Sequence, residues 1–374
     1  MAFIKERYGP GLNAEHTGSA PAFPRFPWVC RGCNGQSPVA SPAVDILSHI
    51  GYHGRLMTDR QEERDMARPF AKWVGGKGQL LPEIRRRYPS DLGTPSRSRY
   101  VEPFVGGGAV LFDVLGAYPS LSEIHANDLN RELINAYLTT RDDVDSLIGL
   151  LRDDFAPSYL PLDHDGRAQV FYGWRRRLNE LIDAHSGDGD IDADGSVYGT
   201  DSVEQAALFL SLLRTCFNGL CRYNGDGHFN TPHGRYRNPS ICDEERLREC
   251  SEALRPVTFH WGSYDRTRDL IDGKTFVYAD PPYREIPGKP SFTAYQKSGF
   301  NDDSQRELAT FLRACKDDGA KVLTSNSDPH NGDPDDDFFD ELYSWATVER
   351  VYARRAINSK GDGRGSITEV LISA

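Results

Sequence analysis

The chain has 374 residues, 38% of them hydrophobic, and a formal net charge of −11 at pH 7. This composition can form a large apolar core, and the chain shows neither an apolar run near the ~18 residues of a membrane span nor a signal segment at its start. We therefore expect a cytoplasmic protein. The acidic balance argues against nucleic acid as a partner, unless the clustered arginines form a local basic face.

Residues 1–66 are rich in Gly, Pro, Ser and His and show little periodicity, so we expect a disordered N-terminal extension. Cys30 and Cys33 in this extension have the spacing of half a zinc site. No second CxxC or HxxxH pair follows, and a total of seven cysteines fits reduced thiols better than a disulfide framework. We interpret the pair as two thiols and expect no metal.

From residue 67 onward, strand and helix patterns alternate. Residues 97–108 predict a strand that runs into a glycine-rich turn, and residues 123–130 predict a strand that ends near Asp128. The other expected elements are helical stretches at 109–118, 131–155, 169–185, 203–215 and 304–317, and strands at 257–264, 275–280, 321–327, 348–353 and 369–373.

This alternation predicts an α/β fold with a mostly parallel sheet covered by helices on both faces. Residues 141–248 break the alternation with helical stretches, an acidic loop and an irregular segment rich in Gly, Arg and aromatic residues. We expect them to form a second, mainly helical domain. It would be inserted between the two parts of the sheet domain, residues 67–140 and 249–374.

The stretch "EPFVGGG" places glycines at the end of a strand, where a ligand can approach the backbone closely. Asp128 ends the next strand, at the position where an acid can accept hydrogen bonds from a ribose. The spacing is GGG rather than GxGxxG, so a tight turn with a helix-capping acid is the alternative. A second glycine loop, "KWVGGK", offers Trp73 for stacking and Lys77 to neutralise a carboxylate, or else forms an ordinary surface turn.

The stretch "DPPY" follows an apolar strand, so Asp280 stands where open α/β sheets place their sites. Neither Pro281 nor Pro282 has an N–H, which leaves the nearby carbonyls as rigid free acceptors. Tyr283 adds a flat face. These residues can hold a planar ring through an exocyclic –NH₂ group, because the site offers acceptors for both of its hydrogens.

Six motifs carry a resemblance to a known family: "KWVGGK", "EPFVGGG", "NDLN", "FNGLCRYNGDGHFNTPHGRYRNP", "DPPY" and "FTAY". Through them, the chain from Phe70 to its end resembles the Dam-type DNA adenine N6-methyltransferases of the alpha group, or D12 class. The resemblance implies a Rossmann-like S-adenosylmethionine-dependent methyltransferase sheet with an inserted DNA-recognition domain. It also implies that Asp280, Pro281, Pro282 and Tyr283 hold a flipped-out adenine. The implied S-adenosylmethionine-binding residues are Trp73, Lys77, Phe104, Gly106, Gly108, Asp128 and Asp280.

The same resemblance assigns residues 217–239 to DNA recognition. Arg222 suits guanine O6 and N7, and Leu220 and Pro232 suit thymine methyl groups. Phe217 stands where the family has Tyr, so it can stack at the gap left by the flipped base but lacks a hydroxyl contact. Further DNA-binding candidates are Asn218, Asn224 and Asn230 for bases or phosphates and Arg235 and Arg237 for phosphates. An irregular aromatic loop packed on its own domain is the alternative.

Two more segments fit this interpretation. The "FTAY" segment, residues 292–295, would close over the substrate, and the hairpin of residues 354–369 offers basic residues to DNA phosphates, or is an ordinary exposed hairpin. The leading hypothesis is therefore methylation of adenine in double-stranded DNA, within GATC. We expect a monomer in a prokaryotic or viral host cell, with a cognate restriction endonuclease as a further partner.

Two other classes of function stay open. An amino-methyltransferase could act on RNA or on a protein amide. The resemblance associates those substrates with Asn at the first position of the tetrad Asp280–Tyr283 ("DPPY"), where this chain has Asp. A non-catalytic DNA-binding relative is the other alternative. The intact Trp73, Lys77, Asp128 and Asp280 argue against such decay.

Overall fold

A computed structural model describes residues 67–186, 198–286, 300–354 and 366–374 of the chain. Residues 1–66 with Cys30 and Cys33, the "FTAY" segment, and residues 355–365 of the last hairpin lie outside the described residues. Within the described ranges, no helix combines the length and apolar character that crossing a bilayer requires.

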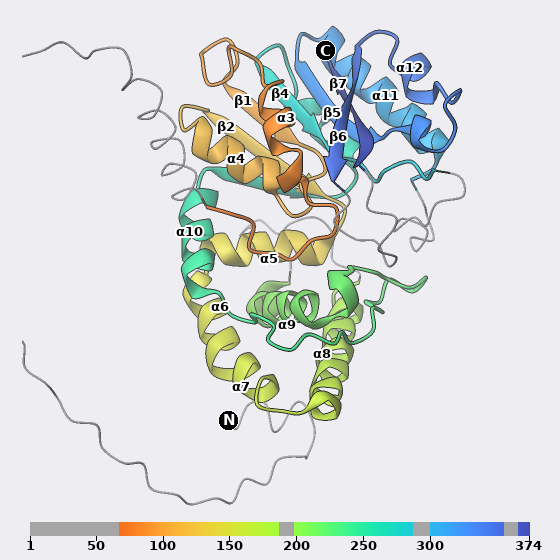
Figure 1. Ribbon diagram of the computed structural model, residues 1–374. Helices are drawn as coiled ribbons and strands as arrows, with labels where there is room; N and C mark the ends of the chain where they lie inside the picture. Colours follow the sequence, from red (N-terminus) through yellow and green to blue (C-terminus); the bar gives the residue numbers. More distant parts are fainter. Residues whose placement is uncertain (1–66, 187–197, 287–299, 355–365) are drawn as a thin grey trace, which may run out of the picture. The chain divides into compact units, whose positions relative to one another are not determined.

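In the described part of the chain, seven strands form one sheet in the order β3-β2-β1-β4-β5-β7-β6 (Figure 1). Neighbouring strands from β3 to β5 are parallel, and β7 is antiparallel to both β5 and β6. The predicted α/β fold with a mostly parallel sheet is confirmed. The strands are β1 (Arg99–Glu102), β2 (Glu123–Asp128), β3 (Val257–Trp261), β4 (Thr275–Ala279), β5 (Lys321–Ser327), β6 (Thr347–Arg354) and β7 (Ser366–Ser373).

Helices and short helical turns connect these strands. In the described residues, the α-helices and one π-helix are α3 (Leu81–Arg85), α4 (Ala109–Ala117), α5 (Arg131–Asp142), α6 (Val144–Leu150), the π-helix η2 (Leu151–Phe155), α7 (Ala156–Tyr159), α8 (His164–Ala184), α9 (Ser202–Thr215), α10 (Glu244–Leu254), α11 (Asp302–Asp317) and α12 (Phe338–Leu342). The 3-10 turns are η1 (Lys77–Gln79), η3 (Gly199–Asp201), η4 (Phe217–Gly219), η5 (Tyr264–Leu270) and η7 (Pro329–Asn331).

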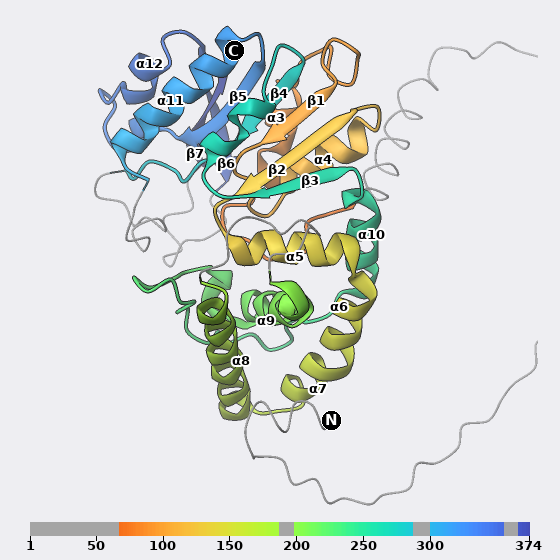
Figure 2. The same ribbon diagram turned by 180° about the vertical axis from the view of Figure 1, so that it is seen from behind.

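Helices cover both faces of the sheet, as the sequence predicts. Successive residues of β4 point to opposite faces: Val277 lies in an apolar cluster with Leu312 of α11, whereas Phe276 packs edge-on against Tyr88. Figures 1 and 2 show α11 on one side and α3 and α4 on the other. All five residues of β4 are buried, which explains why this strand reads as an unbroken apolar run.

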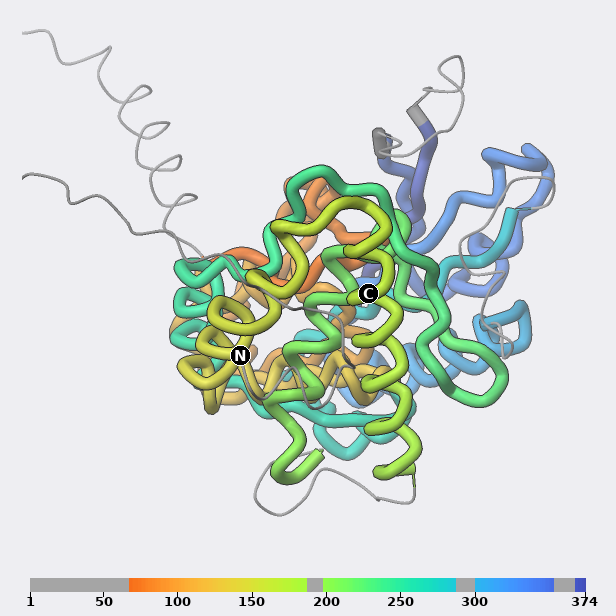
Figure 3. Tube along the Cα trace, turned by 90° about the horizontal axis from the view of Figure 1, so that it is seen from below, coloured from red at the N-terminus to blue at the C-terminus, as the bar shows by residue number. Residues whose placement is uncertain are grey.

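The helices α5 to α9 lie beyond one edge of the sheet (Figure 1). α5 begins directly after β2 and contacts both β3 and α9, so it joins the sheet to the other helices. Seen from below, α8 and α9 run side by side (Figure 3). Side chains cap the first turns of α5 and α8, since Asn130 accepts a hydrogen bond from the Leu133 amide and Asp163 accepts one from the Gly166 amide.

The helix α10 was not among the predicted elements. Its buried residues Leu247, Cys250 and Leu254 recur with helical spacing, and two glutamates occupy its first turn. Both are helix signals that could have been read from the sequence. Arg and Glu residues between the apolar positions obscure the pattern, because they lower the overall hydrophobicity of the segment.

Candidate functional site

The carboxyl ends of the parallel strands β1, β2 and β4 meet at one edge of the sheet, next to α5. This is where open α/β sheets bind ligands. Two hydrogen bonds on Asp128, at the end of β2, tie this edge together: its Oδ2 accepts from the Gly106 amide at 2.9 Å, and its Oδ1 accepts from the Asn130 amide at 2.9 Å. Burial raises the pKa of Asp128, and those amide bonds act in the opposite direction.

The glycine loop after β1 is packed against Trp73. A Cβ atom placed on Gly106 would lie 3.1 Å from Trp73 Nε1, and one on Gly107 would lie 2.9 Å from Trp73 Cβ. Trp73 itself is half-buried, and Leu129, directly after Asp128, is 72% exposed. Leu129 was not among the residues predicted from the sequence, although its signal, an apolar residue directly after a strand-end acid, is present there.

Gly108 has no room for a side chain. Its φ is +75°, and an added Cβ would lie 2.5 Å from the Tyr137 hydroxyl, which donates to the Gly106 carbonyl at 3.0 Å. We expect Gly108→Ala to destabilise the fold by at least ~2 kcal/mol, because backbone strain and the clash add. Thermal denaturation measures this, with Gly149→Ala as the control, since a Cβ on Gly149 meets nothing within 4 Å. Equal melting temperatures for the two variants would contradict it.

The carboxylate of Asp280, just after β4, is held on one oxygen. Lys77 Nζ lies 2.7 Å from Asp280 Oδ1, and Ser325 Oγ of β5 donates to the same oxygen at 2.8 Å. Lys77 also donates to the Gly75 carbonyl at 3.1 Å and is 8% exposed. Among the described residues, Asp280 Oδ2 accepts no hydrogen bond, so it remains available to a ligand.

Only one of the two proline carbonyls in the tetrad is available. The Pro282 carbonyl accepts a hydrogen bond from Gln305 Nε2 of α11 at 3.0 Å, and Gln305 is fully buried. The prediction that the carbonyls around both prolines are free acceptors is therefore wrong for Pro282. No hydrogen bond from a described residue reaches the Pro281 carbonyl, which makes it the second acceptor beside Asp280.

Glu102, at the end of β1, is a buried carboxyl group that the sequence analysis did not single out. It is 2% exposed and accepts a hydrogen bond from the Tyr100 hydroxyl at 2.7 Å. Burial raises its pKa well above the usual value, and the nearby charges of Asp280 and Asp128 raise it further. It is the last residue of β1, directly before Pro103 and the glycine loop, and therefore lies at the carboxyl edge of the sheet.

This pKa shift makes stability depend on pH. The folded protein keeps a proton on Glu102 that the unfolded chain releases above pH 4.5, so stability falls as pH rises from that value towards the folded-state pKa. We expect Glu102→Gln to melt at a higher temperature than the unsubstituted protein at pH 8, because the substitution removes the free-energy cost of keeping Glu102 protonated. The difference in melting temperature should be roughly 2–4 °C for each kcal/mol of that cost, and it should shrink towards pH 4.5. Melting curves from pH 4.5 to 8.5 test this, and exposed Glu341→Gln is the control. An unchanged pH slope in Glu102→Gln would contradict it.

The predicted recognition segment folds into an irregular hairpin with isolated bridges, one joining Tyr223 to Phe229. Arg222 Nε donates to Asn230 Oδ1 at 2.6 Å, so its guanidinium is held against the opposite side of the hairpin. Asn224 Oδ1 accepts two backbone amides within its own turn. Leu220 and Asn230 are half-buried, and the exposed candidates are Phe217, Asn218, Asn224, Pro232, Arg235 and Arg237.

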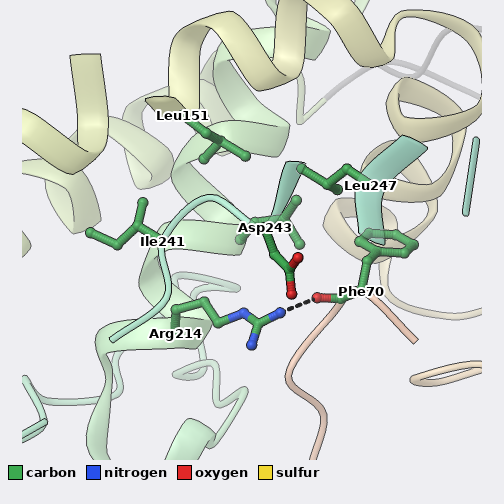
Figure 4. Close-up of a pocket in the computed structure, with 7 residues that line it drawn as sticks. Phe70, Leu151, Arg214, Ile241, Asp243 and Leu247 are labelled. Carbon is green, nitrogen blue, oxygen red and sulfur yellow. Dashed lines mark hydrogen bonds between the residues drawn. The ribbon is translucent and has the colours of Figure 1, made fainter. Parts of the chain in front are cut away.

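The segment before Trp73 touches this hairpin. Lys72 Nζ lies 3.8 Å from the centre of the Tyr236 ring, and its stem runs past Gly219, where a Cβ would come within 2.8 Å of Lys72 Cε. Arg214, at the end of α9, donates to the Phe70 carbonyl at 2.7 Å (Figure 4). Lys72 thus belongs with the recognition segment, a contact that sequence alone does not reveal.

Residues 73–357 match the D12 class N6 adenine-specific DNA methyltransferase family. The chain belongs to this family. It is 40% identical to the type II methyltransferase M.MjaIII of Methanocaldococcus jannaschii over 82% of this chain and 98% of that protein. It is 32% identical to M1.LlaDCHI of Lactococcus lactis subsp. cremoris, over 84% of this chain and 97% of that protein. It is 31% identical to the DNA adenine methylase of Escherichia coli K12, over 81% of this chain and 94% of that protein.

Membership of the D12 class confirms the family resemblance stated from the motifs. The structure brings Trp73, Lys77, the glycine loop, Asp128 and the tetrad to one edge of the sheet. The hairpin that contains Arg222 lies apart from Asp280 in the sequence but contacts the segment that also carries Lys77. The roles assigned to the individual residues remain predictions.

Proposed function

We propose that this D12-class enzyme transfers a methyl group from S-adenosylmethionine to N6 of a flipped-out adenine in double-stranded DNA, within GATC. One arrangement carries the proposal. Asp280 Oδ1 is occupied by Lys77 and Ser325, which leaves Oδ2 and the Pro281 carbonyl to accept the two hydrogens of an exocyclic amine.

These two acceptors would orient the amine for attack. When bound, S-adenosylmethionine supplies an electrophilic methyl group on a sulfonium sulfur. Asp280 and Pro281 would direct the N6 lone pair towards that carbon, and Tyr283 would stack on the ring. Because Asp280 Oδ2 would accept one amine hydrogen, it would also be the base that takes the proton N6 loses as the N6–C bond forms and the methyl–sulfur bond breaks. The chain then contributes mainly positioning and electrostatics.

The residues at the sheet edge fit the cofactor's chemistry. Asp128 offers carboxylate oxygens to ribose hydroxyl groups, and the exposed side chain of Leu129 offers an apolar surface to the adenine base. Lys77 has a third N–H for the methionyl carboxylate besides those directed to Asp280 and Gly75. Trp73 lies against the glycine loop.

Reaching the adenine requires removing it from the duplex, at a cost of a few kcal/mol for unpairing and unstacking. Phe217 is 50% exposed and can stack at the gap that the base leaves. Arg222 suits a guanine, and Leu220 and Pro232 suit thymine methyl groups. The likeness of residues 217–239 to the Dam recognition segment supports GATC as the site.

We further propose that a single copy of the chain acts on the duplex. A cognate restriction endonuclease is consistent with the type II names of M.MjaIII and M1.LlaDCHI. Mapping N6-methyladenine by long-read sequencing, in DNA from a host that expresses the chain, would define the methylated sequence.

The direct test uses the purified full chain with methyl-labelled S-adenosylmethionine. The substrates are duplexes that contain GATC, matched duplexes with that site permuted, and an RNA duplex. We expect label in DNA with GATC, recovered as N6-methyladenine. Label in RNA alone would favour the RNA alternative. DNA binding without transfer to any duplex would favour a non-catalytic relative.

A further inference from the structure

Glu369 contacts the tyrosine of the tetrad from a strand that β5 separates from β4. It lies on β7, paired in register with Ser327 of β5 and Val351 of β6. The Tyr283 hydroxyl donates a hydrogen bond to Glu369 Oε2 at 2.6 Å. Burial raises the pKa of both side chains, and the pKa of Tyr283 rises well above its usual value, so the phenol keeps its proton and acts as the donor.

Lys77 restrains the same ring from one face. Its Nζ lies 4.5 Å from the centre of the Tyr283 ring, while it also pairs with Asp280. The ring is thus held at its hydroxyl by a carboxylate and on one face by a cation. A base that stacks on the ring, as proposed, would therefore use the face away from Lys77.

We propose that Glu369 is a positioning residue for methyl transfer. It fixes the orientation of Tyr283 through the phenolic hydroxyl, so that a base stacked on the ring presents its amine to Asp280. This inference rests on the proposed function, because it assumes that Tyr283 stacks on the target base. A small misplacement of the reacting group is enough to slow a transfer reaction strongly.

The first test is a double-mutant cycle on turnover. We expect Glu369→Val to lower kcat roughly 10- to 100-fold with little change in KM for DNA, and Glu369→Gln, which keeps an acceptor oxygen, to lower it less. In a Tyr283→Phe background, Glu369→Val should have no further effect, because the hydroxyl is already absent. Full additivity of the two changes, or normal turnover of Glu369→Val, would overturn the proposal.

The second test does not depend on turnover. In protein labelled with fluorotyrosine, the ¹⁹F signal that disappears in Tyr283→Phe belongs to Tyr283. We expect it to shift or broaden in Glu369→Val and to stay unchanged in the control Glu349→Gln, which alters a carboxylate of β6 that pairs with Arg87. An unmoved signal would overturn the Glu369 contact. Absence of methyl transfer by the unsubstituted protein, with the signal shift present, would instead overturn the proposed function.

Discussion

Replacing Asp280 with alanine is expected to lower methyl transfer to DNA by roughly 10³-fold or more, because both an amine acceptor and a fixed negative charge are lost. The change also removes the carboxylate partner of Lys77, whose side chain is 9% exposed. The Asp280 side chain is 22% exposed, so the pair is only partly buried. We therefore expect the melting temperature to fall as well, with a loss of stability below the ~3–5 kcal/mol that breaking a fully buried ion pair costs. Initial rates and thermal denaturation measure the two effects.

A second variant separates chemistry from folding. Asp280→Asn keeps the shape and one acceptor oxygen but loses the charge, and we expect a rate at least ~10²-fold below that of the unsubstituted enzyme. Asp317→Ala on α11 is the control, since that side chain is 57% exposed and lies in the last turn of the helix. Near-normal turnover by a folded Asp280→Asn variant would contradict the proposal that Asp280 and the Pro281 carbonyl hold the adenine amine.

Replacing Arg222 with alanine is expected to relax sequence discrimination at one guanine. A bidentate contact to guanine contributes ~1–3 kcal/mol, which is roughly a 5- to 150-fold ratio of kcat/KM between the cognate site and a site with that base pair changed. The bond from Arg222 Nε to Asn230 Oδ1 restrains the side chain before DNA arrives, so little order is lost on binding. The measurement compares kcat/KM on duplexes that differ at single base pairs.

Arg237→Ala provides the contrasting variant. Arg237 is exposed and is a candidate phosphate contact, so its loss should weaken binding to all sequences alike and reduce the salt dependence of binding. If Arg222→Ala also weakened all duplexes to the same degree, Arg222 would be a phosphate contact and not a base reader.

Much of the fold was predictable because its signals are local. The strand β4 is a buried apolar run that Asp280 follows directly, and Asp128 is the last residue of β2. The tetrad and the glycine loop could be recognised for the same reason. They are continuous stretches whose chemistry depends on neighbouring residues.

The supporting contacts could not be predicted in this way. Asp280 is held by Lys77, about two hundred positions earlier, and by Ser325 from another strand. Glu369 reaches Tyr283 only because β7 reverses direction beside β5. The Pro282 carbonyl is occupied by a buried Gln on α11. Each contact depends on how segments far apart in the chain pack together, which no local pattern of residues contains.

The short stretch from Lys72 to Lys77 touches two different parts of the protein. Lys72 contacts Tyr236 of the hairpin that contains Arg222, and Lys77 forms an ion pair with Asp280. Five residues reach at most ~17 Å, and successive base pairs are ~3.4 Å apart. Under the proposed roles, the hairpin reads bases and Asp280 holds the base that is modified. The length of this stretch would then limit how many base pairs can separate the two.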